Sequence, residues 1–365
     1  MTGRRRFLAK ASGAAAAIAA ATIIEAPNVI AQPKIQWRMS TAWTPAILYQ
    51  RAAEQLAKVV EEMSGGRFRI EVFPGGQIME PFDCFDATSQ GKIEAFHAGA
   101  LFWDAKEPAA QWFTTVPFGM NCEGMAAWFY QGDGLKIWEE TYAPFNLVPR
   151  PASQSAPEMG GWFRKKVTTI ADYKGLKMRI PGLGGKVVAR AGATVITLPP
   201  GQIYAALERG VIDTSEYVGP HDDMILGLHK TARYYYYPGW HQPGTTTEFG
   251  FNKKAYDALP VDLRRTLDHA TAAVMIFSLT DFHAKNAIAL QRLRTEFKDK
   301  VEIVQFPAPM MRELKKFASE VVREESGKTP MARKVHASFT KFQALVGPWD
   351  HVAEGAYHQF VAGTP

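Results

Sequence analysis

Cysteine is scarce in this sequence, with only Cys84 and Cys122 among 365 residues. Neither their spacing nor their neighbours fit a metal site. In an oxidising compartment the two thiols can form a disulfide. Otherwise they are unpaired and half-buried, and they pack like small apolar side chains. The sequence leaves both alternatives open.

Motifs that mark an enzyme are also missing. The nine histidines show no zinc-type spacing, and no serine lies in a nucleophile-elbow context. Residues 182–186 resemble a phosphate-binding loop, but the spacing is wrong and Val187 stands where that loop has its magnesium-binding Ser or Thr. His221 and the two aspartates after it follow a Gly-Pro pair, which is typical of an exposed helix start. We therefore expect a protein that binds and does not catalyse.

Strong net charge is absent once the N-terminus is set aside. The formal net charge is +6, and residues 1–31 supply half of it. The remainder is too small to indicate nucleic-acid binding. No long uncharged apolar run follows residue 31, so we expect a soluble mature chain, long enough for two packed lobes.

The first 31 residues predict a targeting segment. Arginines precede an alanine-rich apolar stretch at 11–24, and Val-Ile-Ala at 29–31 fits a cleavage site before Gln32. The order Arg-Arg-x-Phe-Leu at 4–8 resembles a twin-arginine export signal, with a general secretory signal as the alternative. A membrane anchor is disfavoured, because a span needs roughly 20 apolar residues. We expect export to the periplasm, by the twin-arginine pathway.

Periodicity in the first part of the mature chain predicts an α/β fold. Residues 35–39 and 68–73 alternate apolar and polar side chains, as strands do, while 48–63 place apolar residues on one helical face. A helix near 81–90 and a strand at 94–98 follow. This β-α-β-α-β order indicates a parallel sheet covered by helices.

The rest of the chain predicts a second unit and a helical end. From Val261 the pattern is helical almost to the C-terminus, interrupted by a strand at 301–306. No internal repeat and no clean linker occur, which fits two lobes joined by several crossings. Further strands are expected at 161–163, 175–180, 211–217 and 248–252, with a helix start at 186–190 and a helix at 201–209.

Three features between residues 157 and 252 are candidate sites. Arg179 and Glu216 end two predicted strands, and ligands of open α/β sheets sit at such carboxyl ends. The planar guanidinium of Arg179 suits a carboxylate. Either residue is equally compatible with a solvated strand end. The aromatic segment 234–244 is either core or the wall of a small-molecule pocket.

Together with the signal, five segments resemble the TRAP-transporter solute-receptor family: 159–164, 175–179, 202–213, 216–220 and 234–240. They resemble most the branch that binds 2-oxo and 2-hydroxy monocarboxylates, such as pyruvate or lactate, with a metal cation. The resemblance covers essentially the whole mature chain. It implies a two-lobed, flytrap-like periplasmic-binding-protein fold of class α/β with a helical C-terminal region. The expected parts are a signal peptide at 1–31, most of the first lobe at 32–155, the second lobe at 156–247, and at 248–365 a strand returning to the first lobe with C-terminal helices.

The resemblance also implies roles for individual residues. Arg179 is expected to pair with the ligand carboxylate, and Phe102 to touch the ligand. Oxygen ligands alone point to a hard cation, either sodium or calcium, with two carboxylates slightly favouring calcium. The implied ligand contacts are Phe102, Glu158, Arg179, Trp240 and Gln242. The implied cation ligands are Glu158, Glu216, Gln242 and the carbonyl of Tyr217.

Two departures from the family pattern stand out. Relatives usually carry an amide at the position of Glu158 and often a glutamate at that of Gln242. The carboxylate has therefore moved from one of these positions to the other, and the site still has two acids. This is expected if the charges of ligand and cation must balance in a desolvated cleft. Relatives commonly have a tyrosine in place of Phe102, so the identity of the acid stays open.

The sequence therefore predicts a receptor that delivers a small 2-oxo or 2-hydroxy monocarboxylate to a TRAP-type membrane permease. A dicarboxylate, sugar acid or aromatic acid is the alternative ligand. A remote alternative is an exported hydrolase or lyase with Glu158 or Glu216 as its base. The apolar residues of the helical tail after Pro307 either pack on their own lobe or form a homodimer.

Overall fold

The computed structural model describes residues 34–361. The expected signal peptide at 1–31 lies outside the described residues. Within the described part of the chain, no helix is both long enough and apolar enough to cross a membrane.

The first lobe is built on a five-stranded sheet of order β2-β1-β3-β10-β4. Its first three strands are parallel, which confirms the β-α-β-α-β expectation, and β10 lies antiparallel between β3 and β4. The strand expected at 248–252 therefore returns to the first sheet. The bounds are β1 (Ile35–Thr41), β2 (Phe68–Phe73), β3 (Ala95–Ala98), β4 (Leu147–Gln154) and β10 (Thr246–Asn252).

Local sequence explains the helix that covers this sheet. The helix α2 (Leu48–Met63) buries Leu56 and Val60 on its apolar face. It ends at two glycines, Gly65 and Gly66, whose positive φ angles of 61° and 76° cost glycine little. Both the helix and its end were predicted from the sequence.

The second lobe is built on a six-stranded sheet of order β11-β9-β5-β8-β6-β7. Five strands run in one direction, and β5 alone is antiparallel to its neighbours. The carboxyl ends of β6, β8 and β9 therefore meet the amino end of β5 at one edge. The bounds are β5 (Gly161–Phe163), β6 (Lys177–Arg179), β7 (Thr194–Ile196), β8 (Thr214–Ser215), β9 (Tyr234–Tyr237) and β11 (Glu302–Gln305).

Some elements differ from the sequence expectation. The strand expected at 211–217 is reduced to β8, because Gly210 turns with a φ of 71° and Val211 is exposed. The helix α7 (Gly182–Arg190) begins four residues before the expected start. A β-carbon on Gly185 would lie 2.5 Å from the Ile180 carbonyl oxygen, so these glycines let α7 pack closely on the end of β6. They do not form a phosphate loop.

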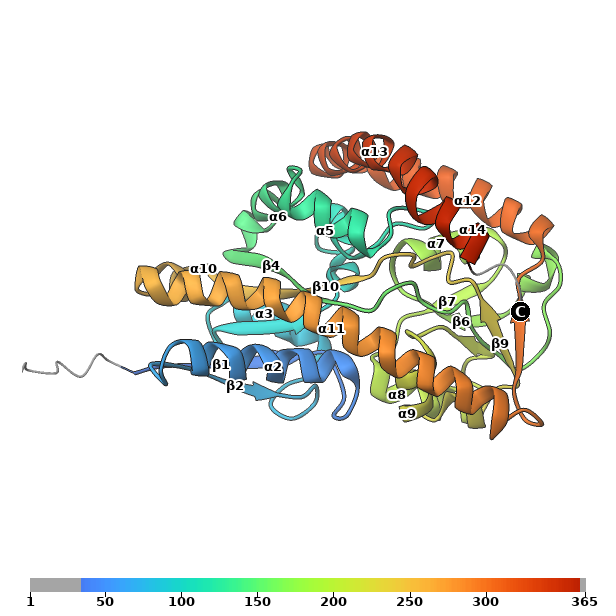
Figure 1. The fold of residues 1–365 in the computed structure, drawn as a ribbon, viewed down its shortest axis with the longest axis horizontal. Helices are drawn as coiled ribbons and strands as arrows, with labels where there is room; N and C mark the ends of the chain where they lie inside the picture. The colour runs from blue at the N-terminus through green and yellow to red at the C-terminus, as the bar shows by residue number, and fades with distance from the viewer. Residues whose placement is uncertain (1–33, 362–365) are drawn as a thin grey trace, which may run out of the picture. The chain divides into compact units, whose positions relative to one another are not determined.

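Long helices join the two lobes. The helix α11 (Val261–Thr295) contacts α2 and β4 of the first lobe and α9 (Pro220–Ile225) of the second, as the orange helix of Figure 1 shows. The strand expected at 301–306 is β11, and it joins the second sheet. After it, α12 (Ala308–Gly327) packs on α7, and α13 (Pro330–Asp350) packs on α5 (Cys122–Tyr130) and α6 (Gly134–Tyr142).

The two cysteines are free and buried. Of the two alternatives that the sequence left open, the structure shows unpaired thiols. In the aromatic segment, Tyr235 and Tyr236 of β9 are fully buried, and Tyr235 stacks on Trp162 at 3.9 Å between ring centroids. The middle of this tyrosine run is therefore core, whereas Tyr237 is exposed.

Candidate functional site

A pocket with about 330 Å³ of empty volume lies between the two lobes. The second-sheet edge supplies Arg179 from the end of β6 and Glu216 from the residue after β8. Glu158 precedes β5 and Gln242 follows β9, so both come to the same edge. Of the implied site residues, Trp240 alone does not line the pocket. Those that line it are Phe102, Glu158, Arg179, Glu216, Tyr217 and Gln242.

Arg179 and Glu216 form a buried ion pair. Nη1 of Arg179 lies 2.5 Å from Oε1 of Glu216, and the two side chains are 2% and 0% exposed. The same Nη1 donates to the Glu216 carbonyl at 3.2 Å, and Nε donates to the Leu198 carbonyl at 3.1 Å. Among the described residues, Nη2 of Arg179 has no hydrogen-bond partner. One side of the guanidinium is thus fixed and the other is available to a ligand.

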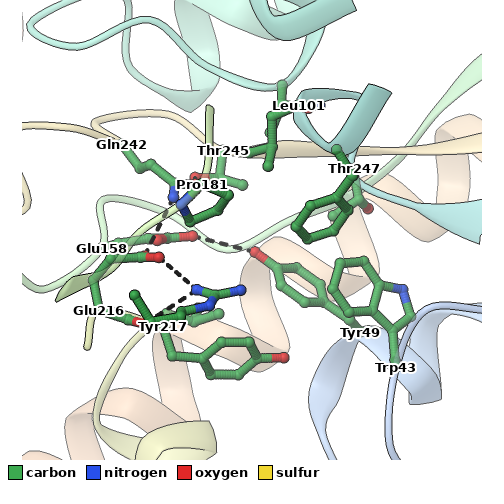
Figure 2. A pocket seen from close by; sticks show the side chains of 15 residues that line it. Trp43, Tyr49, Leu101, Glu158, Pro181, Glu216, Tyr217, Gln242, Thr245 and Thr247 are labelled. Carbon is green, nitrogen blue, oxygen red and sulfur yellow. Dashed lines mark hydrogen bonds and ion pairs between the residues drawn. The ribbon is translucent and has the colours of Figure 1, made fainter. Parts of the chain in front are cut away.

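Glu158 is a second buried carboxylate beside this pair. Its Oε1 accepts hydrogen bonds from the hydroxyls of Tyr49 at 3.3 Å and Ser155 at 3.2 Å. Its Oε2 is buried and has no partner in the described part of the chain. Burial raises the pKa of Glu158 well above its usual range, and the negative charge of Glu216 is the second-largest cause. Figure 2 shows Tyr49 from the first lobe pointing its hydroxyl at Glu158.

His241 and Gln242 complete the polar cluster. Nε2 of His241 lies 3.2 Å from Oε2 of Glu216, and Nε2 of Gln242 donates to the same oxygen at 3.3 Å. Oε1 of Gln242 accepts from Thr245 at 2.9 Å. One ligand atom each from Glu158, Glu216 and His241 lie within 4.8 Å of one another. We expected oxygen donors alone, so this histidine nitrogen is an addition.

The donor set fits a cation. Two buried carboxylates converge on one point, and the single guanidinium of Arg179 can offset only one negative charge. The unpartnered Oε2 of Glu158 leaves a buried acceptor that a cation would satisfy. Gln242 turns its amide nitrogen toward Glu216, so it would have to present Oε1 instead to act as a ligand.

Tyr217 and Trp240, the two remaining residues of the implied set, make mainly aromatic contacts. Tyr217 lines the pocket with its ring, which lies 5.9 Å from the guanidinium carbon of Arg179. Trp240 stacks on Phe118 at 5.8 Å between ring centroids, and its carbonyl accepts from the Phe118 amide at 2.9 Å. Trp240 thus holds the segment after β9 that carries Gln242, and Trp240 itself does not line the pocket.

The apolar side of the pocket belongs mainly to the first lobe, and of its residues only Phe102 was expected, through the family resemblance. Trp43 and Tyr49 pack together at 4.7 Å between ring centroids, and Phe102 lies 6.1 Å from Trp43. Thr247 of β10 also lines this side. Trp43 follows the carboxyl end of the parallel strand β1, so the rule that singled out Arg179 could have found it.

The sequence is similar to those of known proteins over most of its length. Residues 39–328 match the family described as bacterial extracellular solute-binding protein, family 7. A protein of Nostoc sp. named as a monocarboxylate 2-oxoacid-binding periplasmic protein is 38% identical over 332 residues, covering 91% of this chain and 90% of the relative. The chain belongs to solute-binding protein family 7.

Solved structures of similar receptors share the fold. A TRAP periplasmic solute-binding protein from Pseudoalteromonas atlantica, with bound sodium and pyruvate, is 36% identical, with a TM-score of 0.87 over 90% of this chain and 99% of the other. A TRAP solute-binding protein from Bordetella bronchiseptica, described as a dimer with calcium and picolinate in one site, is 34% identical, with a TM-score of 0.87 over 90% and 97%. This family 7 protein therefore has the two-lobed α/β receptor fold that the sequence predicted.

Proposed function

We propose that this family 7 protein is the periplasmic receptor of a TRAP transporter and binds a small 2-oxo or 2-hydroxy monocarboxylate together with sodium or calcium. The observation that carries the proposal is the meeting of Arg179, Glu216 and Glu158 in one buried pocket. The free Nη2 of Arg179 suits a ligand carboxylate.

Charge balance supports the cation. Arg179 offsets Glu216, so an ionised Glu158 and a ligand carboxylate would together leave two negative charges away from water. A cation that bridges Glu158, Glu216 and the ligand oxygens removes that cost. Gln242 would contribute its amide oxygen and Tyr217 its carbonyl. Both hard ions remain candidates, because the relatives hold one or the other.

The lining residues favour a ligand with one carboxylate. Among those the structure describes, Arg179 is the only cationic side chain, and much of the opposite side is aromatic or aliphatic. A second ligand carboxylate would be buried there without a partner, at a cost of several kcal/mol.

A second candidate is an aromatic acid. The Bordetella bronchiseptica relative holds picolinate with calcium. Trp43 and Phe102, which line this pocket, present aromatic surface to such a ring. The cluster of Arg179 and the two glutamates would then serve the same role toward the acid's carboxylate.

Delivery completes the proposal. The signal-like residues 1–31 support export to the periplasm by the twin-arginine pathway, and a TRAP-type permease would receive the ligand. A homodimer is proposed in analogy to the dimeric relative. We propose binding without turnover, so the ligand should be recovered unchanged; nuclear magnetic resonance of the bound acid checks this.

Thermal-shift screening of the mature protein tests the ligand. We expect 2-oxo and 2-hydroxy acids to raise the melting temperature, and more strongly with calcium or sodium present. The Arg179→Ala variant should lose the response, whereas Arg164→Ala, an exposed residue at the end of β5, should keep it. No response from any such acid, or an undiminished response of Arg179→Ala, would refute the proposal.

A further inference from the structure

A buried histidine lies behind the first-lobe side of the pocket. His97 of β3 is 0% exposed and does not line the pocket. The indole Nε1 of Trp43 donates to Nδ1 of His97 at 3.1 Å, and Nε2 of His97 lies 2.9 Å from the hydroxyl of Thr247. Trp43 and Thr247 both line the pocket, whereas the Ser153 hydroxyl, which lies 3.4 Å from Nε2 of His97, does not. His97 therefore connects two wall residues from outside the cavity.

The chemistry of these groups fixes the direction of the hydrogen bonds. An indole nitrogen can only donate, so Nδ1 of His97 must accept. Burial lowers the pKa of His97 to about 3, so its ring is neutral at pH 7. The single ring proton is then on Nε2 and is donated to Thr247. Trp43, His97 and Thr247 form one directed chain.

The hydroxyl of Thr247 has no capacity left for a ligand. Its oxygen accepts from His97 and from the backbone amide of Ser153, the latter at 2.9 Å. Its proton is shared between the Ser153 hydroxyl at 2.6 Å and the Ser153 carbonyl at 3.2 Å. A hydroxyl has two acceptor positions and one proton, and in Thr247 all three are used in hydrogen bonds to residues of the first sheet. The only donor of Trp43 is likewise used.

The surfaces that Thr247 and Trp43 still present to the pocket are apolar. Thr247 can offer its methyl group and Trp43 its ring face, and Phe102 adjoins Trp43. Figure 2 shows Trp43 and Thr247 on the side of the pocket away from Glu216. The polar cluster and this surface thus divide the pocket between a charged end and an apolar end.

We infer that Trp43, Thr247 and Phe102 form an apolar subsite for the ligand's substituent, and that His97 is the positioning residue that keeps this subsite free of hydrogen-bonding groups. The inference rests on the proposed function and deepens it. The preferred ligand class is a 2-oxo or 2-hydroxy acid whose remaining substituent is a short alkyl group. A hydroxyl at that end would lose its water without gaining a partner.

Calorimetric titration with pyruvate and 3-hydroxypyruvate, at fixed calcium, tests the subsite. These acids differ by one hydroxyl on the methyl carbon. We expect wild-type protein to bind pyruvate roughly 10- to 100-fold more tightly, which is the range for an unpaired buried hydroxyl. Equal affinities would overturn the inference while leaving the proposed function intact. Failure of wild type to bind any 2-oxo acid would overturn both.

Substitution of His97 tests its positioning role through the ratio of the two affinities. His97→Phe should free the Trp43 donor and the Thr247 hydroxyl, and so reduce the ratio to within about 3-fold of unity. His97→Gln can still accept from Trp43 and donate to Thr247, so the ratio should recover. If His97 only stabilises the fold, His97→Phe should weaken the binding of both acids equally and leave the ratio of affinities unchanged. That result would overturn the assignment.

A matched control comes from the same network. Ser153→Ala removes a hydroxyl that lies 2.6 Å from Thr247 and 3.4 Å from Nε2 of His97, but it keeps the shorter bonds from Trp43 to His97 and from His97 to Thr247, so the ratio should stay at its wild-type value. A ratio that collapses in Ser153→Ala as well would contradict a specific role of His97. If His97→Phe does not fold, the wild-type ratio and the His97→Gln ratio still decide the inference.

Discussion

The ion pair of Arg179 and Glu216 is nearly free of solvent contact. Removing two charges from water costs several kcal/mol per ion, and a buried pair recovers this only with good geometry and additional hydrogen bonds. Here the carbonyls of Leu198 and Glu216 supply two such bonds. The pair therefore organises the site more than it stabilises the fold.

Breaking the pair should be costly even without ligand. Arg179→Ala leaves Glu216 buried and without its guanidinium partner, so we expect a loss of about 3–5 kcal/mol in the free energy of unfolding. Chemical denaturation of the ligand-free protein measures this. Adding Glu216→Gln to Arg179→Ala should restore part of the loss. Arg164→Ala should change stability by no more than about 0.5 kcal/mol. Equal stabilities of Arg179→Ala and Arg164→Ala would contradict the account.

Most of the charged end of the pocket was predictable from the sequence, but of the apolar wall only Phe102 was expected, through the family resemblance. Arg179 and Glu216 were found because strand ends face clefts, and Glu158 and Gln242 only through the family resemblance. Tyr49 was not predicted because it lies on a helix whose apolar face has the pattern of ordinary core residues. His241 was not predicted because no local sequence motif distinguishes it from its neighbours. Contacts such as that of Tyr49 with Glu158, 109 residues apart, exist only after folding.

At the scale of elements, β10 carries a buried acid that the site does not use. Glu248 is 0% exposed and accepts a hydrogen bond from the indole of Trp103. Burial raises the pKa of Glu248 from 4.5 to about 8. The carboxyl is therefore neutral in the folded protein under conditions where the unfolded chain has already ionised it.

This difference predicts a pH dependence. Between about pH 4.5 and 8 the unfolded chain releases the Glu248 proton while the folded protein retains it, so the Glu248 contribution to stability is full below pH 4.5 and decreases as pH rises. Glu248→Gln should remove this decrease, so at pH 8 the free energy of unfolding of the variant should be a few kcal/mol higher than that of wild type. Urea unfolding at several pH values measures it. Glu71→Gln, on the exposed face of β2, is the control. A constant difference between Glu248→Gln and wild type across this range would contradict the prediction.

The N-terminus of α2 is capped from the other lobe. Ile47 provides no side-chain cap, and instead both carboxylate oxygens of Asp222, in α9, lie 3.1 Å from the Leu48 amide nitrogen. An acceptor at a helix N-terminus satisfies a free amide and the helix dipole. Because the bond joins the two lobes, it exists only while they are together.

We therefore expect Asp222→Ala to weaken both stability and ligand binding. The stability loss should be about 1–2 kcal/mol, as for other caps, and ligand release should be faster because the closed arrangement loses a contact. Stopped-flow displacement measures the release rate. Asn121→Ala removes the cap of α5 within the first lobe, so it should lower stability without changing release. Equal release rates in both variants would count against the cross-lobe role.

Elements were predictable where their pattern is local. The strands β1 and β2 and the helix α2 follow clear periodicity and match the sequence expectation. The strand β4 was missed because Pro149 and Pro151 disfavour a strand, and it lies at the edge of its sheet, where proline is tolerated. The strand β7 is too short to produce a pattern, and β8 is shorter than the strand expected at 211–217.

At the scale of the whole described chain, the two lobes share their supports. The helix α11 contacts both, and α12 and α13 extend from the second lobe onto the first. In Figure 1, α11 runs across the middle of the view, and α12 and α13 lie above it. This explains why the sequence contains no linker. The position of β11 in the second sheet was not predicted, since pairing of distant strands leaves no local signal.

The central claim is that a small monocarboxylate and a cation bind the same site and strengthen each other. Calorimetric titration of chelator-treated mature protein with pyruvate, with and without calcium or sodium, tests it most directly. Because coupling between two ligands is reciprocal, we predict that the cation tightens pyruvate binding by about 10-fold or more, and that pyruvate tightens cation binding by the same factor. Pyruvate binding that is equally tight with and without either cation would contradict the account.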